Sequence, residues 1–206
     1  MDGLYFLWLM WAGWIFTTFL LNKNHYWRLR GSAAVLILII SFPFGISLSG
    51  LQTGVATVLI FLYSMVFIKD FSLSEKLYLF LASFIIGVSY SSLILLSFYD
   101  PIILIADKKI MVTAILLVLS LLLYGERKLF IKRMLAIIIG MVTGECLTGA
   151  VFMQNKIPYQ IGGHFFLDVL SVIVITGLAL NLLQFLTYAQ STIVKSALKK
   201  GEVKNI

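Results

Sequence analysis

The sequence predicts an all-α integral membrane protein: a polytopic bundle of about seven transmembrane helices, with its N-terminus outside the cell and its C-terminus in the cytoplasm. Hydrophobic residues make up 61% of the 206 positions and charged residues only 12%, which is about half the charged fraction of a typical soluble domain. The apolar residues form runs long enough to cross a bilayer. The basic residues lie between those runs, mainly on one predicted side of the membrane.

Seven segments approach the roughly 20 helical residues that a hydrocarbon core of about 30 Å requires. The second contains Pro43, which predicts a kink, and Ser49-Gly50 predicts a tight turn before the third. The fifth is short and spans only if Lys108 and Lys109 extend toward the surface. The predicted spans are 4–21, 32–49, 51–68, 77–98, 108–124, 133–153 and 166–189, in a single membrane domain over 1–206 that ends in a basic cytoplasmic tail, 190–206.

The orientation follows from the 16 lysines and arginines. With these seven spans, only Lys108, Lys109 and Lys156 lie on one side of the membrane, and all the others lie on the opposite side. Because cytoplasmic loops are enriched in Lys and Arg, the N-terminus is predicted outside. Asp2 stands where a signal peptide would carry basic residues, so 4–21 is interpreted as the first span.

Glu145 is the most informative polar residue, because a carboxylate near the middle of a span costs several kcal/mol unless it is protonated or faces a polar cavity. Gly144, Thr148 and Gly149 flank it on the same helical side and favour a close helix interface. Partners at a similar depth are Ser89 and Tyr90 in the fourth span and Thr176 and Gly177 in the seventh. Two interpretations stay open: a proton or cation site, or a neutral acid that hydrogen-bonds between helices.

Two further polar groups lie in or near the seventh span. Asn181 and Gln184 continue a helical stripe that begins at Gly177, and they line a pathway or join helices by hydrogen bonds. His164 and Asp168, four residues apart, share a face at the outer mouth of the span if the segment is helical. They are read either as an acid–base pair or, more simply, as a helix start with an acid near its positive end.

Several functional classes are not supported. The single cysteine, Cys146, excludes an internal disulfide, and zinc-protease, serine-hydrolase and phosphate-loop motifs are absent. We therefore expect no enzyme activity, no cofactor, no metal site and no nucleic-acid partner. The net charge of +7 is explained by membrane topology, and the expected partners are the bilayer, anionic lipids near the basic loops and tail, and a membrane protein partner.

These residues predict an integral membrane protein but assign it no biochemical function, and the first hypothesis is a small proton- or cation-linked transporter that uses Glu145. The alternative is a non-catalytic membrane scaffold or partner subunit in which Glu145 is structural. A lipid-modifying enzyme is a third hypothesis, and it would require His164 and Asp168 to act as acid and base at the outer leaflet.

The opening Met1-Asp-Gly-Leu-Tyr-Phe-Leu-Trp-Leu-Met-Trp-Ala-Gly-Trp-Ile-Phe, the chain length and the order of spans resemble the YphA family of integral membrane proteins from spore-forming bacilli. The resemblance covers the whole chain and rests on general pattern rather than on a diagnostic motif. It implies a multi-pass protein of the bacterial cell membrane, and it supplies no site residues and no assigned activity.

Overall fold

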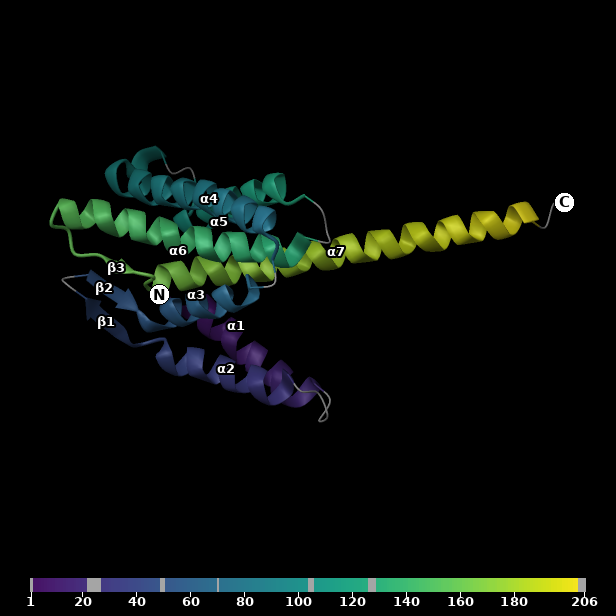
Figure 1. Ribbon diagram of the computed structural model, residues 1–206, viewed down its shortest axis with the longest axis horizontal. Helices are drawn as coiled ribbons and strands as arrows, with labels where there is room; N and C mark the ends of the chain where they lie inside the picture. Colours follow the sequence, from purple (N-terminus) through teal and green to yellow (C-terminus); the bar gives the residue numbers. More distant parts are fainter. Residues whose placement is uncertain are drawn as a thin grey trace.

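The computed structural model describes residues 2–21, 27–48, 51–69, 71–103, 106–125 and 129–203. Over these residues the chain forms seven α-helices that lie lengthwise beside one another, with a small sheet at one end (Figure 1). The helices are α1 (Leu4–Ile15), continued by the π-helix η1 (Phe16–Leu20), α2 (Trp27–Ser41), α3 (Val55–Phe67), α4 (Leu73–Tyr99), α5 (Lys108–Leu123), α6 (Phe130–Gln154) and α7 (His164–Val203). A short 3₁₀ turn, η2 (Pro101–Ile103), follows α4.

Three of the described helices are long and apolar enough to cross a membrane: α4, α6 and the His164–Gln184 part of α7. The apolar helices Leu4–Leu20 and Val55–Phe67 are shorter. Large apolar side chains cover the outside of the bundle, including Trp8, Phe80 and Leu122, each more than 70% exposed. Such a surface is stable against lipid tails and not against water, so the helices belong in a membrane.

Residues 45–48 and 51–54 correct the prediction that 32–49 and 51–68 are helical throughout, while the predicted turn at Ser49-Gly50 lies outside the described residues. They form strands β1 (Gly45–Leu48) and β2 (Leu51–Gly54), which pair antiparallel, and β3 (Gln160–Ile161) joins β2 in parallel. The predicted kink at Pro43 is also wrong, because α2 ends at Ser41 instead. Proline cannot donate to a helix and clashes with the preceding turn, and the alternation of apolar and polar residues around the turn is a strand pattern.

The helices α4 and α6 form the most extensive contact of the fold and run in the same direction. Glu75 pairs with Lys132, and Ser91 accepts a hydrogen bond from Thr148, each pair 57 positions apart. Between them, a Cβ on Gly144 would lie 2.7 Å from the main-chain oxygen of Gly87. The two backbones therefore approach closely because glycines line the interface, as in other tightly packed membrane helices.

The bundle has two distinct ends. At the sheet end lie the three strands, Gly3, Lys109 and the start of α7, which hydrogen bonds bring together. At the opposite end lie Arg28, the Ser72 cap of α4 and Lys132. Helix α7 continues beyond the other helices on that side (Figure 1). Its 40 residues correspond to about 60 Å of helix, roughly twice the thickness of a hydrocarbon core.

Candidate functional site

The carboxyl group of Glu145 is enclosed between α6, α4 and the segment that carries β3. Its side chain is 2% exposed. Oε1 accepts a hydrogen bond from the Tyr90 hydroxyl at 2.5 Å. Oε2 accepts two more, from the Tyr159 hydroxyl at 3.0 Å and from the main-chain N–H of Gly162 at 2.7 Å. Both oxygens are thus occupied by donors from two other parts of the chain: helix α4 and the segment that carries β3.

The segment after α6 turns back into the bundle to reach Glu145. Gly162 adopts φ +64, a left-handed conformation that glycine takes without strain. Its N–H thereby meets Glu145, while its carbonyl oxygen accepts a hydrogen bond from Thr57 of α3 at 2.8 Å. Burial raises the pKa of Tyr159 well above its ordinary value, so this hydroxyl remains protonated and available to donate. Glu145 therefore joins α6 to the sheet and, through Gly162, to α3.

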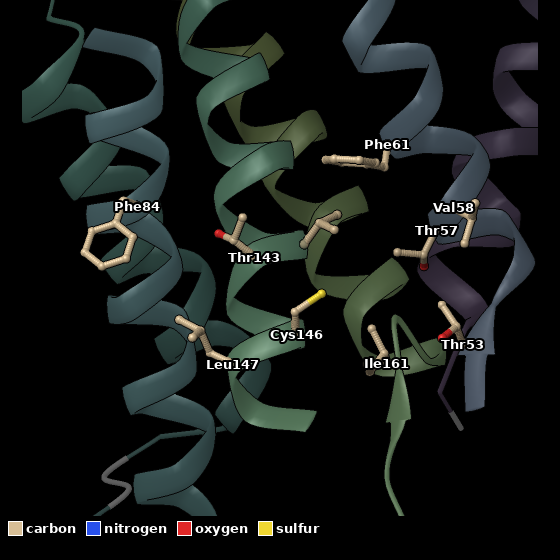
Figure 2. A pocket seen from close by; sticks show the side chains of 10 residues that line it. Thr53, Thr57, Val58, Phe61, Phe84, Thr143, Cys146, Leu147 and Ile161 are labelled. Atoms are coloured by element: carbon tan, nitrogen blue, oxygen red, sulfur yellow. The ribbon is translucent and has the colours of Figure 1, made fainter. Parts of the chain in front are cut away.

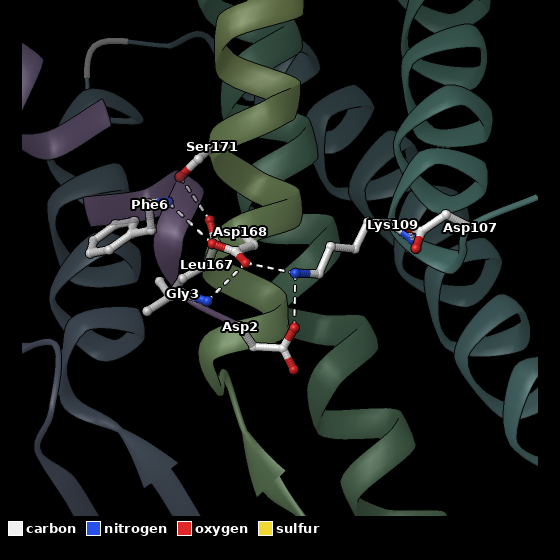
Figure 3. A network of polar contacts seen from close by, with 8 residues as sticks. All are labelled: Asp2, Gly3, Phe6, Asp107, Lys109, Leu167, Asp168 and Ser171. Atoms are coloured by element: carbon white, nitrogen blue, oxygen red, sulfur yellow. Dashed lines mark hydrogen bonds and ion pairs between the residues drawn. The ribbon is translucent and has the colours of Figure 1, made fainter. Parts of the chain in front are cut away.

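A second buried carboxylate, Asp168 of α7, fixes the beginning of the chain (Figure 3). It is fully buried and accepts hydrogen bonds from the main-chain N–H groups of Gly3 at 2.8 Å and Phe6 at 3.2 Å. It therefore serves as the N-terminal cap of α1, a role usually filled by a residue of the same helix. The ammonium group of Lys109 completes the site, 2.8 Å from Asp168 Oδ2 and 2.8 Å from Asp2 Oδ1. The hydrogen bond from Lys109 lowers the pKa of Asp2.

The structure brings together part of the predicted site. Tyr90 reaches Glu145, and Thr148 donates to Ser91 at 3.0 Å and to its own helix at Gly144. Ser89, by contrast, faces outward and donates to the carbonyl oxygen of Ile85. Consecutive residues of a helix point about 100° apart, so Ser89 and Tyr90 cannot both face Glu145.

The other predicted residues lie elsewhere. His164 packs its ring on Phe42, with centroids 4.4 Å apart, while Asp168 turns to Lys109 and α1. Thr176 donates to carbonyl oxygens of its own helix, and Gly177 lies against the Met134 side chain. Among the described residues, the Oε1 atom of Gln184 is enclosed without a hydrogen-bond partner, and Asn181 makes no side-chain hydrogen bond to another helix.

Two apolar cavities flank α3. The first, of about 510 Å³, lies between α3, α4 and α6 beside β2 and β3, and Cys146 and Thr143 line it (Figure 2). Their neighbour Thr57 is already bonded to Gly162, and Thr143 donates to Gly140, so the walls offer almost only carbon. The second, of about 500 Å³, lies between α1, α2, α3, α6 and α7. Part of its lining is exposed on the outside of the bundle, at Ile37 and Tyr63, so the second cavity is open to the surroundings of the protein.

A comparison with known proteins assigns the chain to a family. The family model of the YphA-like integral membrane proteins matches residues 2–203, which is nearly the whole sequence. The chain belongs to this family. The resemblance predicted from the sequence is thereby confirmed. No curated protein and no solved structure matches this YphA-like chain, so its contacts are interpreted from its own chemistry.

Sequence reasoning singled out both carboxylates of this YphA-like protein but missed most of their partners. Tyr159 and Gly162 follow α6 in a stretch that resembles an ordinary loop, and no pattern there indicates a return into the bundle. For Asp168, the partners are main-chain groups near the start of the chain, which sequence patterns do not reveal. The position of Lys109 could have predicted an acidic partner, since a lysine at the edge of a span requires either water or an acid.

The hydrogen bonds of Glu145 hold α6 to α4 and to the segment that carries β3. A carboxylic acid or carboxylate with each oxygen occupied by an internal donor has little capacity left for an external ligand. Tyr90 of α4 donates to one carboxyl oxygen, and Tyr159 of the segment after α6 donates to the other. A transported ion would have to displace these donors, and each of them would then need another acceptor in a buried region.

Proposed function

We propose that this YphA-like protein is a non-catalytic scaffold or partner subunit of the bacterial cell membrane. The observation that carries the proposal is that both carboxyl oxygens of Glu145 are hydrogen-bonded internally, by Tyr90, Tyr159 and Gly162. A buried acid that is satisfied in this way stabilises one conformation, and that is the property a scaffold requires. The resident partner that follows from the family is the lipid bilayer.

The proposal includes seven spans, with the N-terminus outside and the C-terminus in the cytoplasm. The two-ended bundle supports it, because Gly3, Lys109 and Asp168 meet at the sheet end, where α1, α5 and α7 all begin. Helices α4 and α6 begin at the opposite end, where Glu75 pairs with Lys132. This alternation is the one the positive-inside rule predicts. Helices α2 and α3, though short, would span together with the hairpin that joins them.

Proton- or cation-linked transport through Glu145 is the rival proposal. It is supported by the presence of a buried acid with two tyrosine hydroxyls, a group of titratable side chains inside a membrane protein. It is opposed by the apolar walls of both cavities and by the occupied oxygens of Glu145. A lipid-modifying enzyme has weaker support, because His164 packs on Phe42 and Asp168 is engaged by Lys109.

Flux measurements separate the scaffold from the transporter. Purified protein in proteoliposomes, with an internal pH-sensitive dye and imposed gradients of H⁺, Na⁺ or K⁺, should show no flux above that of empty vesicles. The variant Glu145→Gln, which keeps the side-chain shape, should behave identically. A flux in the wild type that is lost in Glu145→Gln, at equal protein incorporation, would contradict the scaffold and establish Glu145 as a coupling group.

A further inference from the structure

The cavity between α1, α2, α3, α6 and α7 is lined by a ring of helices and opens to the outside of the bundle at Ile37 and Tyr63. Neighbouring helices of the ring are in contact, in the order α1, α2, α3, α6, α7 and back to α1. The cavity extends along α1 from Phe6, near the sheet end, to Thr17 in η1, and Gly31 lines it beside Thr17. Eleven helical positions correspond to about 16 Å, close to the thickness of one leaflet of the hydrocarbon core.

The lining of this cavity suits an alkyl chain. The residues around it are mainly aliphatic and aromatic, among them Met10, Val35, Leu38 and Ile60. Three of the hydroxyls that line it are used internally: Thr17 donates to Gly13, Ser64 to Phe61 and Ser171 to Leu167. The fourth belongs to Tyr63, an exposed side chain. Water needs several polar partners to occupy a cavity, and these walls supply almost none. In a membrane, the molecules that supply alkyl chains are lipids.

A positive charge lies beside the end of the cavity at Thr17, outside its lining. Arg28, in the first turn of α2, donates from Nε and Nη2 to the main-chain oxygen of Thr18, at 3.2 and 2.9 Å. This contact uses only part of the donor capacity of a guanidinium. The side-chain hydroxyl of Thr18 is enclosed, and among the described residues it has no hydrogen-bond partner. Thr18 lies in the π-helix η1, an element of a kind frequently found at functional sites.

We propose that this cavity binds one anionic phospholipid, with an acyl chain between the five helices and its phosphate at Arg28, beside the Thr17 end. A phosphate oxygen accepts from the Arg28 donors that the Thr18 carbonyl leaves free. The acyl chain fills the space between Gly31 and Leu38 of α2 and the facing helices. With the orientation proposed above, the lipid belongs to the cytoplasmic leaflet, where anionic headgroups and basic residues attract each other.

Native mass spectrometry of protein taken from vesicles of equimolar phosphatidylcholine and phosphatidylglycerol tests the site. The wild type should retain one phospholipid, predominantly phosphatidylglycerol. Ala34→Phe, which places a ring in the cavity, should lose the bound lipid, while Ala33→Phe, on the exposed side of the same helix, should retain it. The milder Ala34→Leu serves if Ala34→Phe does not fold, and it should reduce retention.

A second set of variants tests the contribution of the Arg28 charge. Arg28→Gln keeps a donor for the Thr18 carbonyl and should still retain a lipid, but the preference for phosphatidylglycerol over phosphatidylcholine should fall about fivefold. Lys69→Gln, an exposed lysine at the same end, should leave the preference unchanged. Excess inorganic phosphate should not release the lipid, because it cannot replace the acyl chain. Equal lipid retention by Ala33→Phe and Ala34→Phe, or no retained lipid in the wild type, would overturn the proposal.

Discussion

The main-chain N–H of Gly162 donates to Oε2 of Glu145 at 2.7 Å, and this bond joins the middle of a transmembrane helix to a loop that returns from the sheet end. It explains how an acid is tolerated in an apolar helix. Outside the membrane, water would donate hydrogen bonds to the carboxyl group. In the bundle, the main chain returns to Glu145 and donates in place of water. The same contact predicts how substitutions of Glu145 behave.

Replacement of Glu145 by glutamine should cost only about 1 kcal/mol of unfolding free energy, because the amide oxygen still accepts hydrogen bonds. Glu145→Leu should cost about 3 kcal/mol or more, since it leaves the Gly162 N–H and two tyrosine hydroxyls without an acceptor. Thermal unfolding in mild detergent measures both. Cys146→Ala, at the neighbouring exposed residue, is the control. Equal losses for the glutamine and leucine variants would contradict the hydrogen-bonded arrangement.

Removal of one member of the pair Asp168 and Lys109 should destabilise the protein strongly. Asp168→Ala deprives Lys109 of its buried partner and also removes the cap of α1, with an expected cost of about 3–5 kcal/mol. Lys109→Met should cost less, because Asp168 keeps its two main-chain donors. A double-mutant cycle by thermal unfolding gives the coupling. Additive effects of the two substitutions would show that the pair contributes nothing.

The α4–α6 interface should not tolerate a methyl group at its glycines. A Cβ at position 144 would lie 2.7 Å from the Gly87 oxygen and 2.8 Å from a ring carbon of Tyr90, so Gly144→Ala should destabilise by about 1–3 kcal/mol. Gly13→Ala is the matched control in another helix, with no atom within 4 Å of the added carbon. It should be neutral or stabilising by about 0.5–1 kcal/mol. A Gly144→Ala variant as stable as Gly13→Ala would contradict the close approach.

The orientation can be tested with single cysteines in a Cys146→Ala background. Asn155→Cys, in the exposed turn after α6, should react in intact cells with a thiol reagent that does not cross membranes. Lys69→Cys, exposed after α3, should react only after the membrane is permeabilised. The reverse pattern would invert the proposed topology, and labelling of both from outside would show that the spans do not alternate as described.

The sequence predicted where helices occur better than where they end. Apolar runs of spanning length identified α4 and α6 to within a few residues, because hydrophobic length is a strong local signal. Residues 45–49 and 51–54 were assigned to helices on either side of a predicted turn because their composition is apolar, although Pro43 and the alternation from Ile46 to Thr53 indicate a strand pair. Strand pairing depends on a partner, and β3 comes from more than a hundred residues later in the chain.

For the site, the sequence identified the carboxyl groups that are energetically unfavourable inside a membrane, but not the hydrogen-bond donors that stabilise them. Glu145 and Asp168 stand out because acids are rare inside spans. Their partners are hydroxyls and main-chain N–H groups of Tyr159, Gly162, Gly3 and Phe6. Every residue except proline carries a main-chain donor, so only the fold reveals which of them reach a carboxylate.

Infrared difference spectroscopy of the Glu145 carboxyl group tests the central claim most directly. Wild-type spectra are compared with those of Glu145→Gln from about pH 5 to about pH 9, a range in which an accessible acid of the kind used in proton transport titrates. The scaffold account predicts a carboxyl signal that keeps one protonation state throughout and does not respond to added Na⁺ or K⁺. A signal that titrates in this range, or that shifts when a cation is added, would contradict a sealed structural acid and favour transport.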